Sequence, residues 1–177
     1  MRRHMAIVAF MVVIIFTGIL FAGLEGVSAK DYPYRVTKVH DGDTFTATDG
    51  NLFFRVRIAG MDAPEKGQPY GKVATHRLSE MILDKDVEIT PVGNGIDSYG
   101  RVLGSVQIGG ENVALSLIRQ GLALYYRPTC QDYPADKKKY NYDPTAYVVS
   151  ENAARSEKLN IWREAEFVYP CKYRKRK

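Results

Sequence analysis

Five short segments with the residue pattern of β-strands constrain the fold of this 177-residue chain more than any other feature. They lie between residues 34 and 108 and read YRVTKVH, TFTAT, LFFRVRIAG, DVEITPV and RVLGSVQI. Turn signals such as DGD, DGN and GGEN separate several of them. Short runs rich in β-branched and aromatic residues, divided by Gly, Asp and Asn, are typical of strands joined by tight turns. The sequence therefore predicts five short strands.

The third of these segments also carries charged residues in an ordered way. Phe54, Val56 and Ile58 alternate with Phe53, Arg55 and Arg57. Because successive side chains of a strand point to opposite faces, the first set is expected in the core and the two arginines on the other face.

Three helices are predicted around these strands. Residues 70–85 carry apolar side chains at helical spacing, as do residues 111–120, and a third helix is expected over about residues 146–159. Residues 127–145 are predicted to be a loop with three prolines. Five strands with a helix inserted after the third indicate an α+β fold that is mainly β: a five-stranded, partly open barrel of the oligonucleotide-binding (OB) type with three packed helices.

The N-terminal 29 residues have the pattern of a secretory signal. Arg2 and Arg3 precede an apolar run over residues 6–24, and Val27-Ser28-Ala29 offers a cleavage site of small residues. An uncleaved membrane anchor remains the alternative, because the run approaches the length of a spanning helix. Both interpretations place the domain of residues 30–171 outside the cytoplasm, secreted or periplasmic.

The predicted export determines the expected redox state of the two cysteines, Cys130 and Cys171. An oxidising compartment favours a disulfide between them over two free thiols. Two cysteines without neighbouring histidines do not complete a zinc site.

The net charge of +5 depends on the end of the chain. Residues 30–171 hold 18 basic and 19 acidic residues, whereas the tail of residues 172–177, KYRKRK, holds five bases. The charge therefore indicates no basic groove in the domain, but a basic tail can attract polyanions.

Carboxylates gather in two motifs, HDGDTF at residues 40–45 and RIAGMDAPE at residues 57–65. Each alone is compatible with a simple turn or capped loop. If the fold joins them, Asp43, Asp62 and Glu65 concentrate negative charge that calls for a cation, and their oxygen donors suit calcium or magnesium. Arg57 precedes Asp62 by five residues and could add phosphate binding, and Arg101 in IDSYGR is either a second phosphate ligand or a surface salt bridge.

The motifs HDGDTF, VRIAGMDAPE, DSYGR, ALSLIRQGLA and SEKLNIW, in this order and spacing, resemble the staphylococcal nuclease family over about residues 34–162. The resemblance implies an OB barrel with three helices and calcium-dependent hydrolysis of DNA and RNA, with cleavage at the 5′ oxygen and 3′-phosphorylated products. No protein partner is implied, and a monomer is expected. A non-catalytic OB module that binds nucleic acid or protein is the alternative, because a fold alone does not prove activity.

The resemblance also assigns roles to residues. Asp43 and Asp62 match calcium ligands, with the backbone carbonyl of Ala63 as a further ligand. Glu65 matches the residue that acts on the attacking water, and Arg57 and Arg101 match the phosphate-binding arginines. Tyr99 matches a tyrosine near the terminal phosphate, and Asp41 is a supporting residue of the turn.

Two departures from the family pattern concern substrate binding. The KGQPYG loop after Glu65 is shorter than its lysine-rich counterpart, and LALYYRPTC introduces Tyr125 and Tyr126 before an inserted segment. Either tyrosine could stack on a base or belong to the core.

Overall fold

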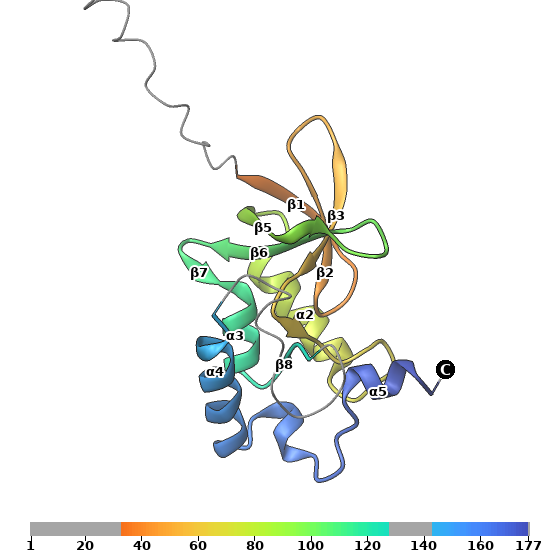
Figure 1. The fold of residues 1–177 in the computed structure, drawn as a ribbon, viewed down its shortest axis with the longest axis vertical. Helices are drawn as coiled ribbons and strands as arrows, with labels where there is room; N and C mark the ends of the chain where they lie inside the picture. The colour runs from red at the N-terminus through yellow and green to blue at the C-terminus, as the bar shows by residue number, and fades with distance from the viewer. Residues whose placement is uncertain (1–32, 128–142, 177) are drawn as a thin grey trace, which may run out of the picture. The chain divides into compact units, whose positions relative to one another are not determined.

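A barrel of five strands forms one end of the domain in the computed structural model, which describes residues 33–127 and 143–176 (Figure 1). The strands are β1 (Tyr34–Val39), β2 (Thr44–Thr48), β3 (Phe53–Ile58), β5 (Asp86–Ile96) and β6 (Val102–Ile108). They pair antiparallel in the order β3-β2-β1-β5-β6. The five predicted strands are confirmed.

The barrel is closed, whereas the sequence suggested a partly open one. Parallel pairing of β3 with β6 joins the two edges of the sheet, with Ile58 opposite Gly104. A Cβ at Gly104 would lie 2.7 Å from a methyl group of Ile89 and 3.3 Å from the carbonyl oxygen of Thr90. A glycine at this position therefore lets β5 and β6 approach closely beside the β3–β6 pairing that closes the barrel.

Three two-residue strands were not anticipated. β4 (Met61–Asp62) pairs with β8 (Leu124–Tyr125), and β7 (Glu111–Asn112) pairs with β6. β4 follows directly after Gly60, whose φ of 81° lies in the left-handed region. This turn ends β3 and directs Asp62 toward the end of the barrel that carries the site described below.

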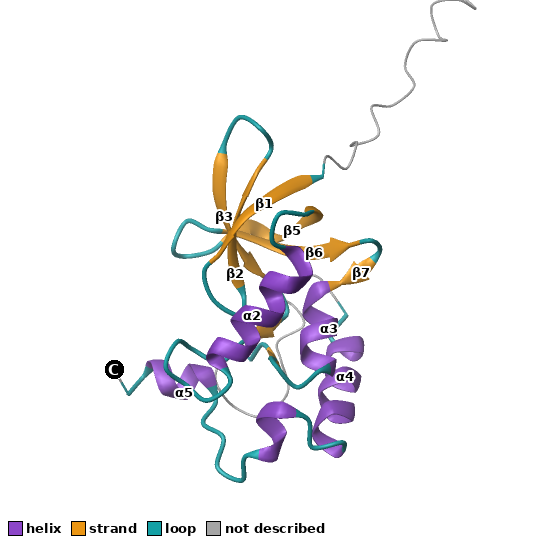
Figure 2. Ribbon diagram, turned by 180° about the vertical axis from the view of Figure 1, so that it is seen from behind, coloured by secondary structure: helices purple, strands orange, loops and turns teal. Residues whose placement is uncertain are grey.

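The predicted helices are confirmed with shifted ends: α2 (Gly71–Ile82), α3 (Val113–Arg119) and α4 (Thr145–Ser156). The second helix begins later than expected because Glu111 and Asn112 pair with β6, and the Asn112 side chain caps α3 by accepting a 3.0 Å hydrogen bond from the Leu115 amide. Two short elements follow, the 3₁₀ helix η1 (Asn160–Arg163) and α5 (Pro170–Arg174). Figures 1 and 2 show α3 and α4 side by side, with α5 on the opposite side of the domain.

The core lies between the barrel and these helices. Its largest fully buried side chains include several from β2, β3, α2 and α3: Phe45, Val56, Ile58, Leu78, Ile82, Leu117 and Ile118. Trp162 in η1 packs beside the Arg155 guanidinium, 4.3 Å from its ring centroid, and so joins η1 to α4.

The described residues belong to one compact unit. Within residues 33–127 and 143–176, no helix has the length and apolar character needed to cross a membrane. The predicted signal or anchor and Cys130 lie outside the described residues. The signal peptide and the Cys130–Cys171 disulfide therefore stay predictions.

Glu151 on α4 is a buried charge on which the packing of β8 depends. Its side chain forms an ion pair with Arg127 and accepts a 3.1 Å hydrogen bond from the Tyr125 amide. Removing one partner of a buried pair is costly, so Glu151→Ala is expected to lower the free energy of unfolding by about 3 kcal/mol in urea titrations. The exposed pair Arg119–Glu157 provides the control, and Glu157→Ala should cost less than about 1 kcal/mol. Equal costs would contradict a special role for Glu151.

Candidate active site

The site is built where β2, β3 and β4 meet. Thr44 pairs with Arg57 across β2 and β3, and the Ile58 amide donates to the Asp43 carbonyl oxygen at 2.9 Å. This register places the Asp43 carboxylate beside the end of β3, where the Gly60 turn also brings Asp62. The two carboxylate motifs of the sequence are therefore joined in space, as expected.

Arg57 bridges the two aspartates. Its Nη1 lies 2.5 Å from Asp43 Oδ2 as an ion pair without hydrogen-bond alignment, and its Nη2 donates to Asp62 Oδ1 at 3.1 Å. All three side chains are about nine-tenths buried. Arg57, which was expected simply on the opposite face from the core side chains, is thus enclosed by the residues that it neutralises.

A second arginine, from the far end of the chain, continues this arrangement. Arg174 in α5 donates to both oxygens of Asp62, at 3.0 Å and 3.1 Å, and to Glu65 Oε1 at 2.5 Å. Asp43, Arg57, Asp62, Arg174 and Glu65 therefore alternate in charge along one continuous chain of contacts.

Burial and pairing act in opposite directions on these groups. Burial raises the pKa of Asp43 and of Asp62, and Arg57 only partly offsets this effect. Burial alone would lower the pKa of Arg57, but the facing aspartates outweigh it and raise that pKa. The buried carboxylates thus depend on nearby positive charge to remain ionised.

Asp43 is also fixed by its turn. It accepts hydrogen bonds from the Ala63 amide at 3.0 Å and the Thr44 hydroxyl at 3.1 Å, while its own amide donates to Asp41 Oδ1 at 3.1 Å. A Cβ at Gly42 would lie 2.6 Å from the Ala63 Cβ, so only glycine lets this turn pack against Ala63. Asp41 supports the turn, as predicted.

Arg101 is held in place from the loop between β5 and β6. Its Nε donates to Asp97 Oδ2 at 2.7 Å, its amide donates to Asp97 Oδ1 at 3.0 Å, and its Nη1 donates to the Thr44 hydroxyl at 3.3 Å. Burial acts to raise the pKa of Asp97, but these hydrogen bonds prevail and lower it. The salt bridge considered for Arg101 is present, and it directs the guanidinium toward the Asp43 turn.

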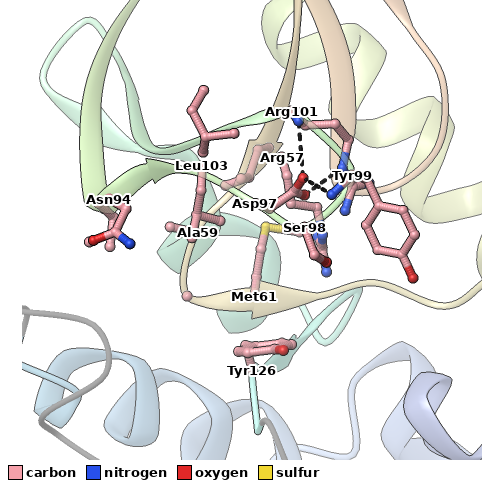
Figure 3. Close-up of a pocket in the computed structure, with 15 residues that line it drawn as sticks. Arg57, Ala59, Met61, Asn94, Asp97, Ser98, Tyr99, Arg101, Leu103 and Tyr126 are labelled. Carbon is pink, nitrogen blue, oxygen red and sulfur yellow. Dashed lines mark hydrogen bonds and ion pairs between the residues drawn. The ribbon is translucent and has the colours of Figure 1, made fainter.

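A cavity of about 420 Å³ opens beside Arg57 and Arg101, here called the two barrel arginines (Figure 3). Its lining includes Arg57, Arg101, Tyr99, Met61 and Tyr126. Figure 3 shows Tyr126 beneath Met61 and the Tyr99 ring pointing outward at the rim, where it is 83% exposed. Arg57, which pairs with Asp43 and Asp62, therefore also borders a space large enough for a small organic group.

The two neighbouring tyrosines differ in their surroundings. Tyr125 is buried and packs against Tyr147, with 5.7 Å between ring centroids, whereas Tyr126 borders the cavity. Tyr125 therefore belongs to the core, and the expected base-stacking role is open only to Tyr126.

Residues 55–164 match the protein family described as "Staphylococcal nuclease homologue". This chain belongs to the staphylococcal nuclease family. An uncharacterised endonuclease of Escherichia coli is 34% identical over the full length of both chains. An uncharacterised endonuclease of Haemophilus influenzae is 31% identical over 89% of this chain and 81% of its own. A micrococcal nuclease of Shigella flexneri is 31% identical over 82% of each chain.

The residues that the staphylococcal nuclease family would use for a metal ion have the right chemistry but are engaged with arginines. Among residues 33–127 and 143–176, no three His, Cys, Asp or Glu side chains are grouped so that they could hold a metal directly. Yet Asp43, Asp62 and Glu65 all turn carboxylate oxygens onto cationic groups within one connected cluster. Calcium and magnesium prefer hard oxygen donors, so the chemistry of these carboxylates, though not their present grouping, fits a divalent ion.

Two residues of this cluster were missed by sequence reasoning. Arg174 lies 112 positions from Asp62 and was assigned to a flexible basic tail, but the structure has it in α5. Gln68 is buried, accepts from the Glu65 amide at 2.8 Å and donates to the Val168 carbonyl oxygen at 2.8 Å. Only the excess of bases after Cys171 hinted at a role for the tail, and nothing in the pattern singled out Gln68.

Proposed function

We propose that this protein is an exported, calcium-dependent nuclease that hydrolyses single-stranded or locally opened DNA and RNA with little sequence preference. Membership of the staphylococcal nuclease family supports the nuclease class and nucleic acids as substrates. The observation that carries the proposal is the convergence of Asp43 and Asp62 on Arg57, with Glu65 joined to Asp62 through Arg174. Arg57 and Arg101 also line one cavity. A module that only binds nucleic acid has no need for this concentration of buried carboxylates.

The two barrel arginines are suited to the phosphate. Arg57 and Arg101 both border the cavity, and each is anchored by carboxylates that fix its orientation. A phosphodiester in front of them would receive hydrogen bonds from two preorganised guanidinium groups, and these strengthen as charge builds on the phosphoryl oxygens. Tyr99 at the rim would lie near the terminal phosphate, and Tyr126 would stack on a base.

Glu65 is proposed to act on the attacking water. It would orient the water and accept its proton as the oxygen attacks phosphorus, and the bond from phosphorus to the 5′ oxygen breaks. The 5′ oxygen leaves with the bonding electrons and takes a proton from solvent, so that the phosphate stays on the 3′ side. Calcium, held by Asp43, Asp62 and the Ala63 carbonyl, would supply further stabilisation of the phosphoryl charge when bound.

The test is cleavage of single-stranded DNA and RNA by residues 30–177, which include the compact unit. Activity should appear with Ca²⁺ and disappear with a calcium chelator, and readdition of Ca²⁺ should restore it, while Mg²⁺ alone measures ion selectivity. End-group analysis of the products should give 3′-phosphate and 5′-hydroxyl termini. Folded protein that binds oligonucleotides but leaves them intact at every Ca²⁺ concentration would instead support the non-catalytic module.

The proposed export has its own measurement. Mass spectrometry of the mature protein from envelope and medium fractions should find an N-terminus near Lys30, which a retained anchor would not give. The same sample, mapped without reduction, should yield a peptide pair joined through Cys130 and Cys171.

A further inference from the structure

Arg174 lies where it blocks the chemistry proposed for the site. Its guanidinium engages both Asp62 oxygens and one oxygen of Glu65, and the second contact to Asp62 Oδ1 comes from Arg57. A carboxylate oxygen that accepts charged hydrogen bonds at these distances is not free to coordinate a metal ion. Glu65, which is proposed to act on the attacking water, is thus paired with Arg174.

Residues 164–174, which lead into and form α5, are held beside Asp62 and Glu65 by contacts with the loop after Glu65. The Gln68 side chain links the Glu65 amide to the Val168 carbonyl oxygen, and the Tyr70 hydroxyl lies 3.3 Å from Glu164 Oε1. Pro170 at the start of α5 is buried, and a Cβ at Gly67 would lie 3.2 Å from the Tyr173 hydroxyl. Residues 67–70, shortly after Glu65, thus contact the C-terminal segment, which positions Arg174 over the carboxylates.

The charge of the cluster explains why a cation is favourable there. The Asp62 side chain is 7% exposed and would keep its ion pair with Arg57 if Arg174 departed, although Arg57 also faces Asp43. The Arg174 side chain remains 42% exposed, so it can leave toward solvent without unfolding the barrel. The contact therefore joins Asp62, a buried carboxylate that needs a second positive charge, to Arg174, a donor that can move into solvent.

We propose that Arg174 is an internal competitor of the metal ion: it occupies Asp62 and Glu65 when no divalent cation is bound and must leave before the site is loaded. This inference rests on the calcium role proposed above. The competition raises the calcium concentration at which the site fills, and it keeps Glu65 from acting on water until the metal has displaced Arg174. The basic C-terminal tail is thereby part of the control of the site.

The test is calcium binding by isothermal titration calorimetry, without substrate, on wild-type residues 30–177, Arg174→Gln and Arg176→Gln. Arg176 is the matched control because it is an exposed arginine of the same tail and its loss changes the net charge equally. Arg174→Gln should lower the apparent dissociation constant for Ca²⁺ by about tenfold, as expected for loss of a partly exposed pair with bidentate geometry. Arg176→Gln should remain within about twofold of wild type, because its charge is screened by solvent.

The outcomes separate the inference from the proposed function. Equal dissociation constants for wild type and Arg174→Gln would overturn the competition while leaving the calcium role intact. Weaker binding in Arg174→Gln would overturn it too and make Arg174 a support of the metal site. If none of the three proteins binds Ca²⁺, both the competition and the proposed metal role are wrong.

A structural readout tests the displacement directly. In ¹⁵N spectra of arginine side chains, with the Arg174 signal assigned by its loss in Arg174→Gln, saturation with Ca²⁺ should shift that signal toward the position of a solvated arginine. An Arg174 signal that stays unchanged while calorimetry reports full loading would show that the ion and the guanidinium bind together, and the competition would be rejected.

Discussion

Replacement of Glu65 by Gln is expected to lower the rate of phosphodiester cleavage by about 10²- to 10⁴-fold, the usual cost of losing a general acid or base. Gln has nearly the same shape, and the contact that holds the loop uses the Glu65 backbone amide rather than its side chain. The fold should therefore persist, with an unchanged circular dichroism spectrum. The measurement is kcat under saturating Ca²⁺ and substrate. A wild-type kcat in this variant would show that Glu65 does not act on the attacking water.

Glu65 has a second contact that must be separated from its chemical role. Its 2.5 Å contact with Arg174 means that Glu65→Gln also loosens the C-terminal segment. The double variant Glu65→Gln/Arg174→Gln resolves the two, because coupled residues deviate from additivity. A catalytic Glu65 predicts that the loss of rate persists in the Arg174→Gln background, whereas a residue that only positions α5 predicts no further loss there. Glu88→Gln, an exposed change on β5, controls for the loss of one negative charge.

The barrel could be predicted from the sequence because its signals are local. Alternation in segments such as Phe53–Ile58 and the glycine turns between strands specify where strands begin and end. The two-residue pairing of β4 with β8 could not be read in this way, since neither strand has a pattern of its own and the pairing exists only after the chain has folded. The same holds for closure through Ile58 and Gly104, which are 46 positions apart.

In the candidate site, too, the features that depend on local sequence could be predicted, and those that depend on distant contacts could not. The approach of Asp43 to Asp62 followed from strand register and from the turn after Ile58, both encoded nearby. Which of Tyr125 and Tyr126 borders the cavity could not be predicted: neighbouring residues of an extended segment face opposite sides, and the sequence does not say which side is the core. Arg174 was beyond local reasoning, because its partners lie 112 and 109 positions away and a run of bases at a chain end reads as solvated.

Replacement of Arg57 by Gln is expected to damage stability and activity together. Asp43 and Asp62 are 8% and 5% exposed, and Arg57 supplies positive charge to both. Removing one member of such a buried cluster should lower the free energy of unfolding by about 3 kcal/mol in calcium-free urea titrations. Loss of a preorganised phosphate donor should also lower kcat/KM by at least about 10²-fold. Arg55→Gln is the matched control, because Arg55 is exposed on the same strand and its loss should change stability by less than about 0.5 kcal/mol.

Adding calcium to Arg57→Gln distinguishes the role of Arg57 in stability from its role in activity. A divalent ion bound by Asp43 and Asp62 restores positive charge between them, and a ligand that binds only the folded state stabilises it by mass action. Saturating Ca²⁺ should therefore return much of the stability of Arg57→Gln, measured as a recovered urea midpoint. It should not return the activity, since the ion does not replace the Arg57 guanidinium that borders the cavity. Recovery of both would mean that Arg57 serves only to balance charge, and recovery of neither would mean that the two aspartates do not hold the ion.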